Sequence, residues 1–137
     1  MAVRLAAFAS VGTTHGGRND SDDDPTGRHC GVLVDGEVVA VCSMFNEPSP
    51  IVAATPAWRI RGMATLPDHQ SHGYGGMLLE SFVDWVAANG GGLMWANLRL
   101  AAIPFYERHG FRPHGEPFAT ASGALHRYGD RIVSPSA

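Results

Sequence analysis

Apolar and polar positions change their period several times along this chain, and the changes predict an alternation of strands and helices. Met1–Val11 has the pattern of a short strand or helix, and Gly12–Arg28 is rich in loop-forming residues. Gly31–Val34 and Glu37–Met44 are β-branched runs joined by Asp35-Gly36, a pair typical of tight hairpin turns. This part of the chain therefore predicts an antiparallel hairpin.

A proline-rich connection, Asn46–Pro56, precedes the next predicted strand, Ala57–Leu66. Apolar and charged residues alternate in the first half of this strand, so that Arg59 and Arg61 share one face. Gly62 interrupts the strand, and a glycine inside a strand often marks a bulge or the close approach of a ligand. This strand is thus a candidate wall of a binding site.

Helical spacing begins at Tyr74 and continues to Asn89, where the glycines of 90–92 end it. The apolar stripe of this helix consists of Leu79, Phe82, Val83 and Val86. The elements that follow are a strand at Leu93–Asn97, a helix at Ala101–His109 and two strands at Phe111–Phe118 and Ala124–Tyr128. The strand–helix–strand order over 57–97 implies a parallel pair, and the hairpins around it imply a mixed sheet of the α/β class.

The composition indicates one globular domain over residues 1–137, located in the cytoplasm. Apolar residues make up 45% of the chain and charged residues 17%, which is ordinary. The formal net charge of −3 argues against nucleic acid or an anionic membrane surface as a partner. No stretch approaches the ~20 apolar residues of a membrane helix, and no secretion signal is evident. Cys30 and Cys42 form no CxxC pair, so we expect buried apolar residues rather than redox partners.

Several other classes of site are excluded by residues that are missing. All ten basic residues are arginine, which excludes a Schiff-base lysine and the lysine of a P-loop. Asp20–Asp24 resembles the start of a calcium loop, but Pro25 and Gly31 stand where that loop needs glycine and glutamate. The histidines have no framework that supplies further zinc ligands. We therefore expect no bound metal.

The segment from Arg61 to Gly76 carries the candidate chemistry. A strand leads into a glycine-rich turn, and the turn opens the helix predicted from Tyr74. The first N–H groups of a helix have no internal partners and lie at the positive end of its dipole. Because Gly73 and Gly75 let an anion approach the backbone closely, the turn predicts a phosphate cradle that needs no lysine.

The spacing of this turn differs from two common phosphate motifs. A Rossmann fingerprint would need glycine where Leu78 stands, and a Walker loop would need a lysine. The spacing Gln70-x-x-Gly73-x-Gly75 instead resembles the acetyl-CoA signature of the GNAT superfamily of N-acetyltransferases. A second family element, Phe-Tyr-x-x-x-Gly-Phe, stands at the expected distance downstream, at 105–111.

The resemblance covers roughly residues 31–128 in the expected order and has consequences for fold and function. It implies the GNAT fold, a mixed and mostly antiparallel twisted sheet whose central parallel strands splay apart, with flanking helices. The N-terminal part would be shortened, and residues 1–29 would be an atypical, loop-rich segment. The implied reaction is transfer of the acetyl group of acetyl-CoA to a primary amine of a small molecule or peptide by direct attack.

The same resemblance implies roles for individual residues. Tyr106 would be the general acid that protonates the leaving thiolate of coenzyme A, the alternative being a tyrosine packed against the core. Coenzyme contacts would come from the interrupted strand, the turn, the helix start and the end of the next strand, at Met63, Ala64, Thr65, Gln70, Ser71, His72, Gly73, Tyr74, Gly75, Gly76 and Asn97. The strand residues would pair with the pantetheine arm as with an added β-strand. His72 is equally an exposed loop histidine, and Asn97 is equally a turn former.

Several questions stay open at the level of the sequence. The interrupted strand carries no carboxylate that matches the general base of some relatives. The remaining candidates are Glu47, His114, Glu116 and His126, or ordered water with no dedicated residue. Arg59 and Arg61 would attract a carboxylate-bearing amine, face solvent, or pair with the acidic residues of 20–24.

The short N-terminal segment favours considering a second function class, a binding module rather than an enzyme. Helices that wall the acceptor pocket in relatives have little room before residue 31. A regulatory or degenerate module that binds acyl-CoA without acceptor chemistry is therefore the alternative to an enzyme. The expected partners are coenzyme A and an amine acceptor, and a homodimer is one way of completing the acceptor site.

Overall fold

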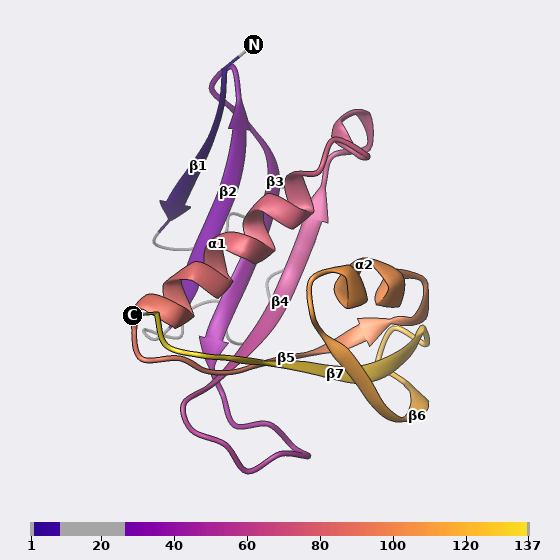
Figure 1. The fold of residues 1–137 in the computed structure, drawn as a ribbon. Coiled ribbons are helices and arrows are strands. Elements are labelled where there is room, and N and C mark those ends of the chain that lie inside the picture. Colours follow the sequence, from indigo (N-terminus) through magenta and orange to yellow (C-terminus); the bar gives the residue numbers. More distant parts are fainter. Residues whose placement is uncertain (1, 9–26, 137) are drawn as a thin grey trace. The chain divides into compact units, whose positions relative to one another are not determined.

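The structure, a computed structural model, describes residues 2–8 and 27–136 (Figure 1). Its strands are β1 (Val3–Phe8), β2 (Arg28–Val34), β3 (Glu37–Asn46), β4 (Ala57–Thr65), β5 (Gly92–Arg99), β6 (Arg112–Ala119) and β7 (Leu125–Val133). Its helices are α1 (Tyr74–Ala88) and α2 (Ile103–Arg108), with short 3-10 turns η2 (Pro67–His69) and η3 (Leu100–Ala102). The strands hydrogen-bond in the order β1-β2-β3-β4-β5-β7-β6, which confirms the predicted mixed sheet.

The chain forms two compact units. The first consists of Met1–Asn46 and Ile60–Trp85, and the second of Glu47–Arg59 and Val86–Ala137. Strand β4 begins in the second unit and ends in the first. The predicted Gly12–Arg28 loop and the acidic residues 20–24 fall largely outside the described residues, and only Gly27 and Arg28 are seen, Arg28 as the start of β2.

The first unit is built on the antiparallel strands β1, β2 and β3. Asp35 and Gly36 both have positive φ, 52° and 86°, as the two central residues of a type I′ hairpin turn require. The turn sets the register from Val34 opposite Glu37, and the ladder shifts once, between Val32 and Leu33. The predicted hairpin is thus confirmed, and β1 shows that the N-terminal apolar run is a strand.

Helix α1 covers one face of this unit (Figure 1). Leu79 and Phe82 are buried, as the helical spacing predicts. The Ser81 hydroxyl lies 3.9 Å from the Cys30 sulfur on β2. The Arg28 guanidinium lies 4.2 Å from the ring centre of Trp85. These contacts hold the helix against β2. Along the chain, the first turn of the helix follows the end of β4 through a short loop.

The two cysteines lie directly opposite each other in the β2–β3 ladder as free thiols. Cys42 is fully buried, and burial raises the pKa of its thiol well above the ordinary value. Cys30 is only half-buried. The expectation of a buried apolar cysteine is therefore met at Cys42 and in part at Cys30.

In the second unit, β4 is parallel to β5 over Ala57–Arg59 and Leu93–Trp95. β7 lies antiparallel to β5 and β6 antiparallel to β7. The buried cluster on one face of these strands consists of Ala57, Leu93, Trp95 and Tyr128, with Val52 and Ala54 of the preceding loop packed on it. The predicted parallel pair is confirmed.

Two predicted elements have different limits in the structure. The helix expected at Ala101–His109 divides into η3 and α2, with Pro104 at the start of α2, where its missing N–H is not needed. The last strand continues to Val133, five residues beyond the predicted end. The prediction ended the strand at Tyr128 because Gly129 and the buried Asp130 are both residue types that are unusual inside a strand. None of the described helices has the length and apolarity needed to cross a bilayer.

Gly91, just after α1, provides a test of this packing. It has φ of 76°, and a Cβ there would lie 2.5 Å from the Val133 carbonyl oxygen and 2.8 Å from the Pro135 nitrogen. We expect Gly91→Ala to lower the free energy of unfolding by about 3 kcal/mol or more, since backbone strain alone costs roughly 1–3 kcal/mol. Urea denaturation measures this loss.

Gly90→Ala is the matched control. Gly90 also has positive φ, 99°, but nothing lies within 4 Å of its Cβ position. In Gly90→Ala the free energy of unfolding should therefore fall only by the cost of the strained backbone, roughly 1–2 kcal/mol. Equal losses at the two positions would contradict the close approach of Val133 to Gly91.

Candidate functional site

The loop between β4 and α1 begins with a 3-10 turn at Pro67–His69. Gln70 closes this turn with an extended backbone, its N–H donating to the Pro67 carbonyl at 3.4 Å. The Gln70 side-chain amide donates back to the Thr65 carbonyl at 3.4 Å. Gln70 thus ties the loop to the end of β4.

The next residues turn the backbone toward the helix. Ser71 and Gly73 both have positive φ, 65° and 81°. Ser71 is the more unusual, because residues with a Cβ rarely adopt this conformation outside functional or strained sites. Nothing lies within 4 Å of a Cβ placed on Gly73, so the backbone at that point is open to an approaching group.

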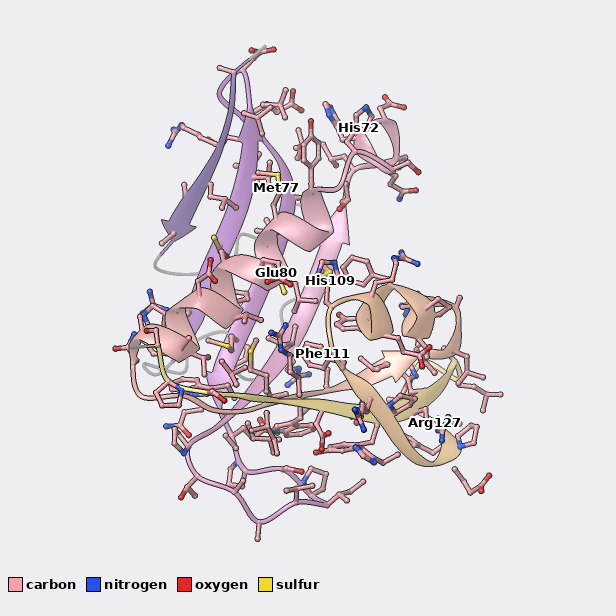
Figure 2. The ribbon with its side chains drawn as sticks, in the orientation of Figure 1. His72, Met77, Glu80, His109, Phe111 and Arg127 are labelled. Atoms are coloured by element: carbon pink, nitrogen blue, oxygen red, sulfur yellow. The ribbon has the colours of Figure 1, made fainter. Side chains whose placement is uncertain are left out.

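His72 is held in place by its own loop (Figure 2). Its Nδ1 lies 2.8 Å from the Gln70 carbonyl oxygen and 3.1 Å from that of His69. Since both partners are acceptors, Nδ1 must carry a proton and donate it. The ring stacks on Tyr74 with centres 5.6 Å apart. Only Nε2 therefore remains for a ligand.

Helix α1 begins at Tyr74, and its first internal hydrogen bond runs from the Met77 N–H to the Gly73 carbonyl at 3.1 Å. The backbone N–H groups of Tyr74, Gly75 and Gly76 precede that bond. No acidic side chain stands in the first turn to neutralise the positive end of the dipole. Tyr74 itself is buried, so only its backbone N–H is suited to contact a ligand.

Met63, Ala64 and Thr65 form the last three residues of β4, immediately before this loop. All three are half-buried. Gly62, just before them, has φ of 68°, which agrees with the predicted interruption of the strand. The first unit thus brings together ten of the eleven residues implied in coenzyme binding, in one stretch from Met63 to Gly76.

The second unit carries Asn97 and Tyr106. Tyr106 lies on α2, is 8% exposed, and meets Phe105 and Phe111 edge-on, with ring centres 5.1 and 5.4 Å apart. Its carbonyl oxygen accepts the N–H of Phe111 at 3.0 Å. Half-buried Asn97 lies opposite Tyr128 in the β5–β7 ladder. The Phe-Tyr-x-x-x-Gly-Phe element is therefore a packed aromatic unit around the end of α2.

These geometries are accompanied by a direct match of sequence. The family model described as acetyltransferase (GNAT) family matches residues 5–111. The chain belongs to this family.

A relative of this GNAT chain, the uncharacterized N-acetyltransferase YitI of Bacillus subtilis (strain 168), is 31% identical over 90 residues. The match covers 66% of this chain and 60% of YitI, so the chain spans less than two thirds of that relative.

Two solved structures share the GNAT fold. The ribosomal-protein-S18-alanine N-acetyltransferase from Escherichia coli has a TM-score of 0.73 at 18% identity, covering 99% of this chain and 97% of its own. An aminoglycoside 6'-N-acetyltransferase complexed with coenzyme A has a TM-score of 0.65 at 13% identity, covering 87% of this chain and 83% of its own. The recognition of the family and the fold from the sequence is confirmed.

A chain of polar side chains crosses the second unit of this GNAT chain. The Ser49 hydroxyl lies 2.6 Å from the Tyr128 oxygen, and the Tyr128 hydroxyl donates to Asp130 Oδ2 at 2.8 Å. The other oxygen of that carboxylate, Oδ1, lies 2.8 Å from His114 Nε2. Ser49 is itself held by the backbone N–H groups of Ile51 and Val52. Only His114 of this polar chain was a candidate from the sequence.

The other candidate bases have different surroundings. Glu47 forms an ion pair with Arg59 at 2.9 Å, and the Arg59 guanidinium lies 5.0 Å from the Trp95 ring centre. Glu116 is exposed, and His126 Nδ1 is 3.0 Å from the Ala124 carbonyl oxygen. Arg59 is thus engaged by Glu47 and Trp95. Within residues 2–8 and 27–136, no group of acidic, histidine or cysteine side chains is arranged to hold a metal.

The acidity of Tyr128 follows from its place in this polar chain. Burial raises the pKa of Tyr128 to about 12, the Ser49 hydroxyl opposes the rise, and the Asp130 carboxylate adds to it. Folding therefore favours the protonated phenol. This contribution to stability is complete below pH 10, the ordinary tyrosine pKa, and is lost as the pH rises toward 12.

We expect the tyrosinate absorbance of the folded protein to show a step near pH 12 that disappears in Tyr128→Phe. The matched control Tyr74→Phe should keep this step. A titration of Tyr128→Phe that still shows the late step would contradict the assignment.

Proposed function

We propose that this protein is an N-acetyltransferase that moves the acetyl group of acetyl-CoA to a primary amine of a small molecule or peptide. The proposal rests above all on the loop Gln70–Gly73 and the helix start behind it, because their open N–H groups suit a diphosphate. Family membership supports the use of acetyl-CoA. The two structural neighbours named above are a ribosomal-protein-S18-alanine N-acetyltransferase and an aminoglycoside 6'-N-acetyltransferase, and an amine acceptor agrees with both names.

In this proposal the pyrophosphate of the coenzyme binds the backbone N–H groups from Ser71 to Gly76. The positive end of the α1 dipole and the missing acidic residue in its first turn support this placement. His72 adds a donor through Nε2 only when it is protonated, because Nδ1 already donates to the loop backbone. The coenzyme is bound without a metal.

The pantetheine arm would pair with Met63–Thr65 as an added strand would. Backbone amides of an extended ligand and an open strand satisfy each other's hydrogen bonds, which is why such pairing recurs in recognition. Asn97, near the end of β5, is a further proposed contact of the coenzyme. These contacts would place the thioester for direct attack by the amine.

Tyr106 would protonate the thiolate of coenzyme A as the tetrahedral intermediate collapses. A phenol is protonated at neutral pH and can donate to a developing thiolate. The aromatic packing of Tyr106 against Phe105 and Phe111 supports a fixed orientation for its hydroxyl. A fixed donor loses little entropy in the transition state.

The cradle is tested by placing a charge in it. We expect Gly75→Glu to weaken coenzyme A binding at least tenfold more than Gly75→Gln, because a carboxylate a few ångströms from the pyrophosphate costs several kcal/mol at an effective dielectric constant of about 20. The glutamine variant matches the size without the charge. Isothermal calorimetry with coenzyme A measures both affinities.

The folded state of Gly75→Glu should not be weakened by the charge, since an acidic residue near a helix N-terminus is favourable. Wild-type protein should gain about 2.7 kcal/mol of stability from acetyl-CoA at roughly 100 times its Kd. No gain in stability at millimolar acetyl-CoA would contradict the proposed function.

The general acid is tested by Tyr106→Phe. Loss of the hydroxyl should lower kcat about 100-fold, in the range of general acid catalysis, while coenzyme A affinity stays within twofold. Thiol release from acetyl-CoA is followed with amino acids, their amides, short peptides and spermidine as acceptors. Unchanged turnover in Tyr106→Phe would remove the assignment, and coenzyme binding without thiol release by wild type would favour a regulatory module.

A further inference from the structure

A cavity of about 420 Å³ lies in the second unit, beside the first residues of β6, and we call it the β6–β7 cavity. The residues that line it are Gly110, Arg112, His114, Asp130, Arg131 and Ile132. They lie on both sides of the point where the ladder between β6 and β7 ends, at Arg112 opposite Asp130. β7 continues to Val133, and on the side of β6 this continuation has no ladder partner among the described strands. The cavity is thus formed within one unit, at the edge of the sheet.

Positive side chains outnumber negative ones in the β6–β7 cavity. Arg112 and Arg131 carry two positive charges, and Asp130 carries one negative charge. Arg112 is exposed, and its guanidinium has no hydrogen bond or ion pair with any other residue that the structure describes. A cavity with this balance of charge attracts an anion and disfavours a cationic amine.

The Asp130 carboxylate is already satisfied inside the protein. The Tyr128 hydroxyl donates to its Oδ2 at 2.8 Å, and His114 Nε2 lies 2.8 Å from its Oδ1. The Asp130 side chain is only 11% exposed. An anion in the cavity therefore meets two arginines and one histidine, while the carboxylate keeps its own donors.

The same carboxylate fixes which nitrogen of His114 is left for a ligand. An ionised carboxylate only accepts, so the proton between Nε2 and Oδ1 belongs to the imidazole. Nδ1 has no hydrogen-bond partner among the described residues, and the side chain is 44% exposed. A neutral ring presents a lone pair at Nδ1, whereas a protonated ring donates an N–H there. Binding of an anion at this ring is therefore linked to the uptake of a proton.

The charged and titratable groups around the His114 ring come from both strands. Asp130 holds the ring from β7, and the ring centre of Tyr128 lies 6.0 Å from that of His114. The others are Arg112 and Arg131 at the cavity, with Glu116 and His126 further along the hairpin. The nearest anionic group is thus one that already accepts a proton from His114.

Arg131 is held beside the cavity by the end of α2. Its Nη1 donates to the His109 carbonyl at 2.8 Å. A Cβ placed on Gly110, which has φ of 82°, would lie 3.3 Å from both Cδ and Nε of Arg131. The glycine therefore lets the guanidinium stem lie against the backbone in a fixed position. A donor that is fixed beforehand loses less entropy when a ligand binds.

We propose that the β6–β7 cavity binds a phosphate group of a small molecule, with Arg112, His114 and Arg131 as its donors. Guanidinium groups bind phosphate through strong, charge-assisted hydrogen bonds. Three donors from different positions suit a tetrahedral oxyanion, whose oxygens point in several directions, whereas one arginine fork is enough for a planar carboxylate. The inference goes beyond the proposed function, because this binding requires neither acetyl-CoA nor an acetyl acceptor.

Titration of nitrogen-15-labelled protein with sulfate tests the site, since sulfate is a tetrahedral dianion whose charge does not change near neutral pH. Backbone amide signals of Gly110 and Ile132 report the cavity, and those of Ser71–Gly76 report the helix start, where sulfate also has donors. We expect Gly110 and Ile132 to shift in a saturable way at millimolar sulfate. Malonate, which carries planar carboxylates, should bind about fivefold more weakly or worse.

Arg112→Gln removes one donor and one charge from the cavity. It should weaken sulfate binding, as reported by Gly110 and Ile132, about fivefold or more. The matched control is Arg108→Gln, because Arg108 is an exposed arginine of α2 that does not line the cavity. The control should stay within about twofold of wild type, as expected for a screened surface charge. Since both arginines are exposed, both variants should keep the dispersed spectrum of the folded protein, which the same experiment records.

The part played by His114 has a separate readout. Wild type should bind sulfate about fivefold more tightly at about pH 6 than at about pH 8, because an imidazole gains its positive charge over this range. His114→Gln should bind sulfate equally at the two pH values, since an amide does not titrate. A residue that only supports the fold would not produce this difference.

Two phosphates identify the source of the group. Ile132 is 77% exposed and offers apolar surface at the cavity, and the volume leaves room for an organic substituent. Tighter binding of phenyl phosphate than of inorganic phosphate would support the site and assign it to a phosphate ester. Equal binding would support it with free phosphate as the ligand.

The opposite results are equally definite. No saturable shift of Gly110 and Ile132 below about 100 mM sulfate, equal weakening in Arg112→Gln and Arg108→Gln, or tighter binding of malonate than of sulfate each overturns the phosphate site. Wild-type affinity that is independent of pH overturns the role of His114. The proposed transferase is tested separately, by whether coenzyme A shifts the amides of Ser71–Gly76.

Discussion

The parallel pairing of Ala57–Arg59 with Leu93–Trp95 is the constraint on which the rest of the structure depends. Parallel neighbours cannot be joined by a tight turn, so the chain must cross over before β5. Helix α1 makes most of that crossing. The turn that opens α1 therefore directly follows the end of β4, and its free N–H groups lie beside the last residues of the strand. The candidate coenzyme site is a consequence of this connection.

The same strands create the second feature, a face with both aromatic and charged groups. Trp95 stacks against Tyr128 at 5.8 Å, and its indole N–H donates to the Glu47 carbonyl at 2.8 Å. Asp130 is buried next to them, and a buried carboxylate is costly unless donors surround it. Tyr128 and His114 supply those donors. The need to satisfy one buried charge thus fixes a tyrosine and orients a histidine.

Local patterns predicted what depends on neighbours in sequence. Sequence patterns predicted the hairpin at Asp35-Gly36, the limits of α1 to within one residue, and the turn before α1. These features are predictable because turn chemistry and helical spacing act over a few residues. The last strand was predicted too short, since Gly129 and Asp130 oppose strand propensity. Pairing with β5 and β6 outweighs that preference, and no local pattern records such pairing.

The sequence by itself determined the family, the mixed sheet and the glycine-rich turn that opens a helix, because these rest on spacing along the chain. The structure decided the surroundings of the candidate bases. The sequence alone does not distinguish Glu47, His114, Glu116 and His126, and it is the register of β6 on β7 that joins His114 to Asp130. Strand register is set by pairing between distant residues, and a shift of one position would turn His114 to the other face.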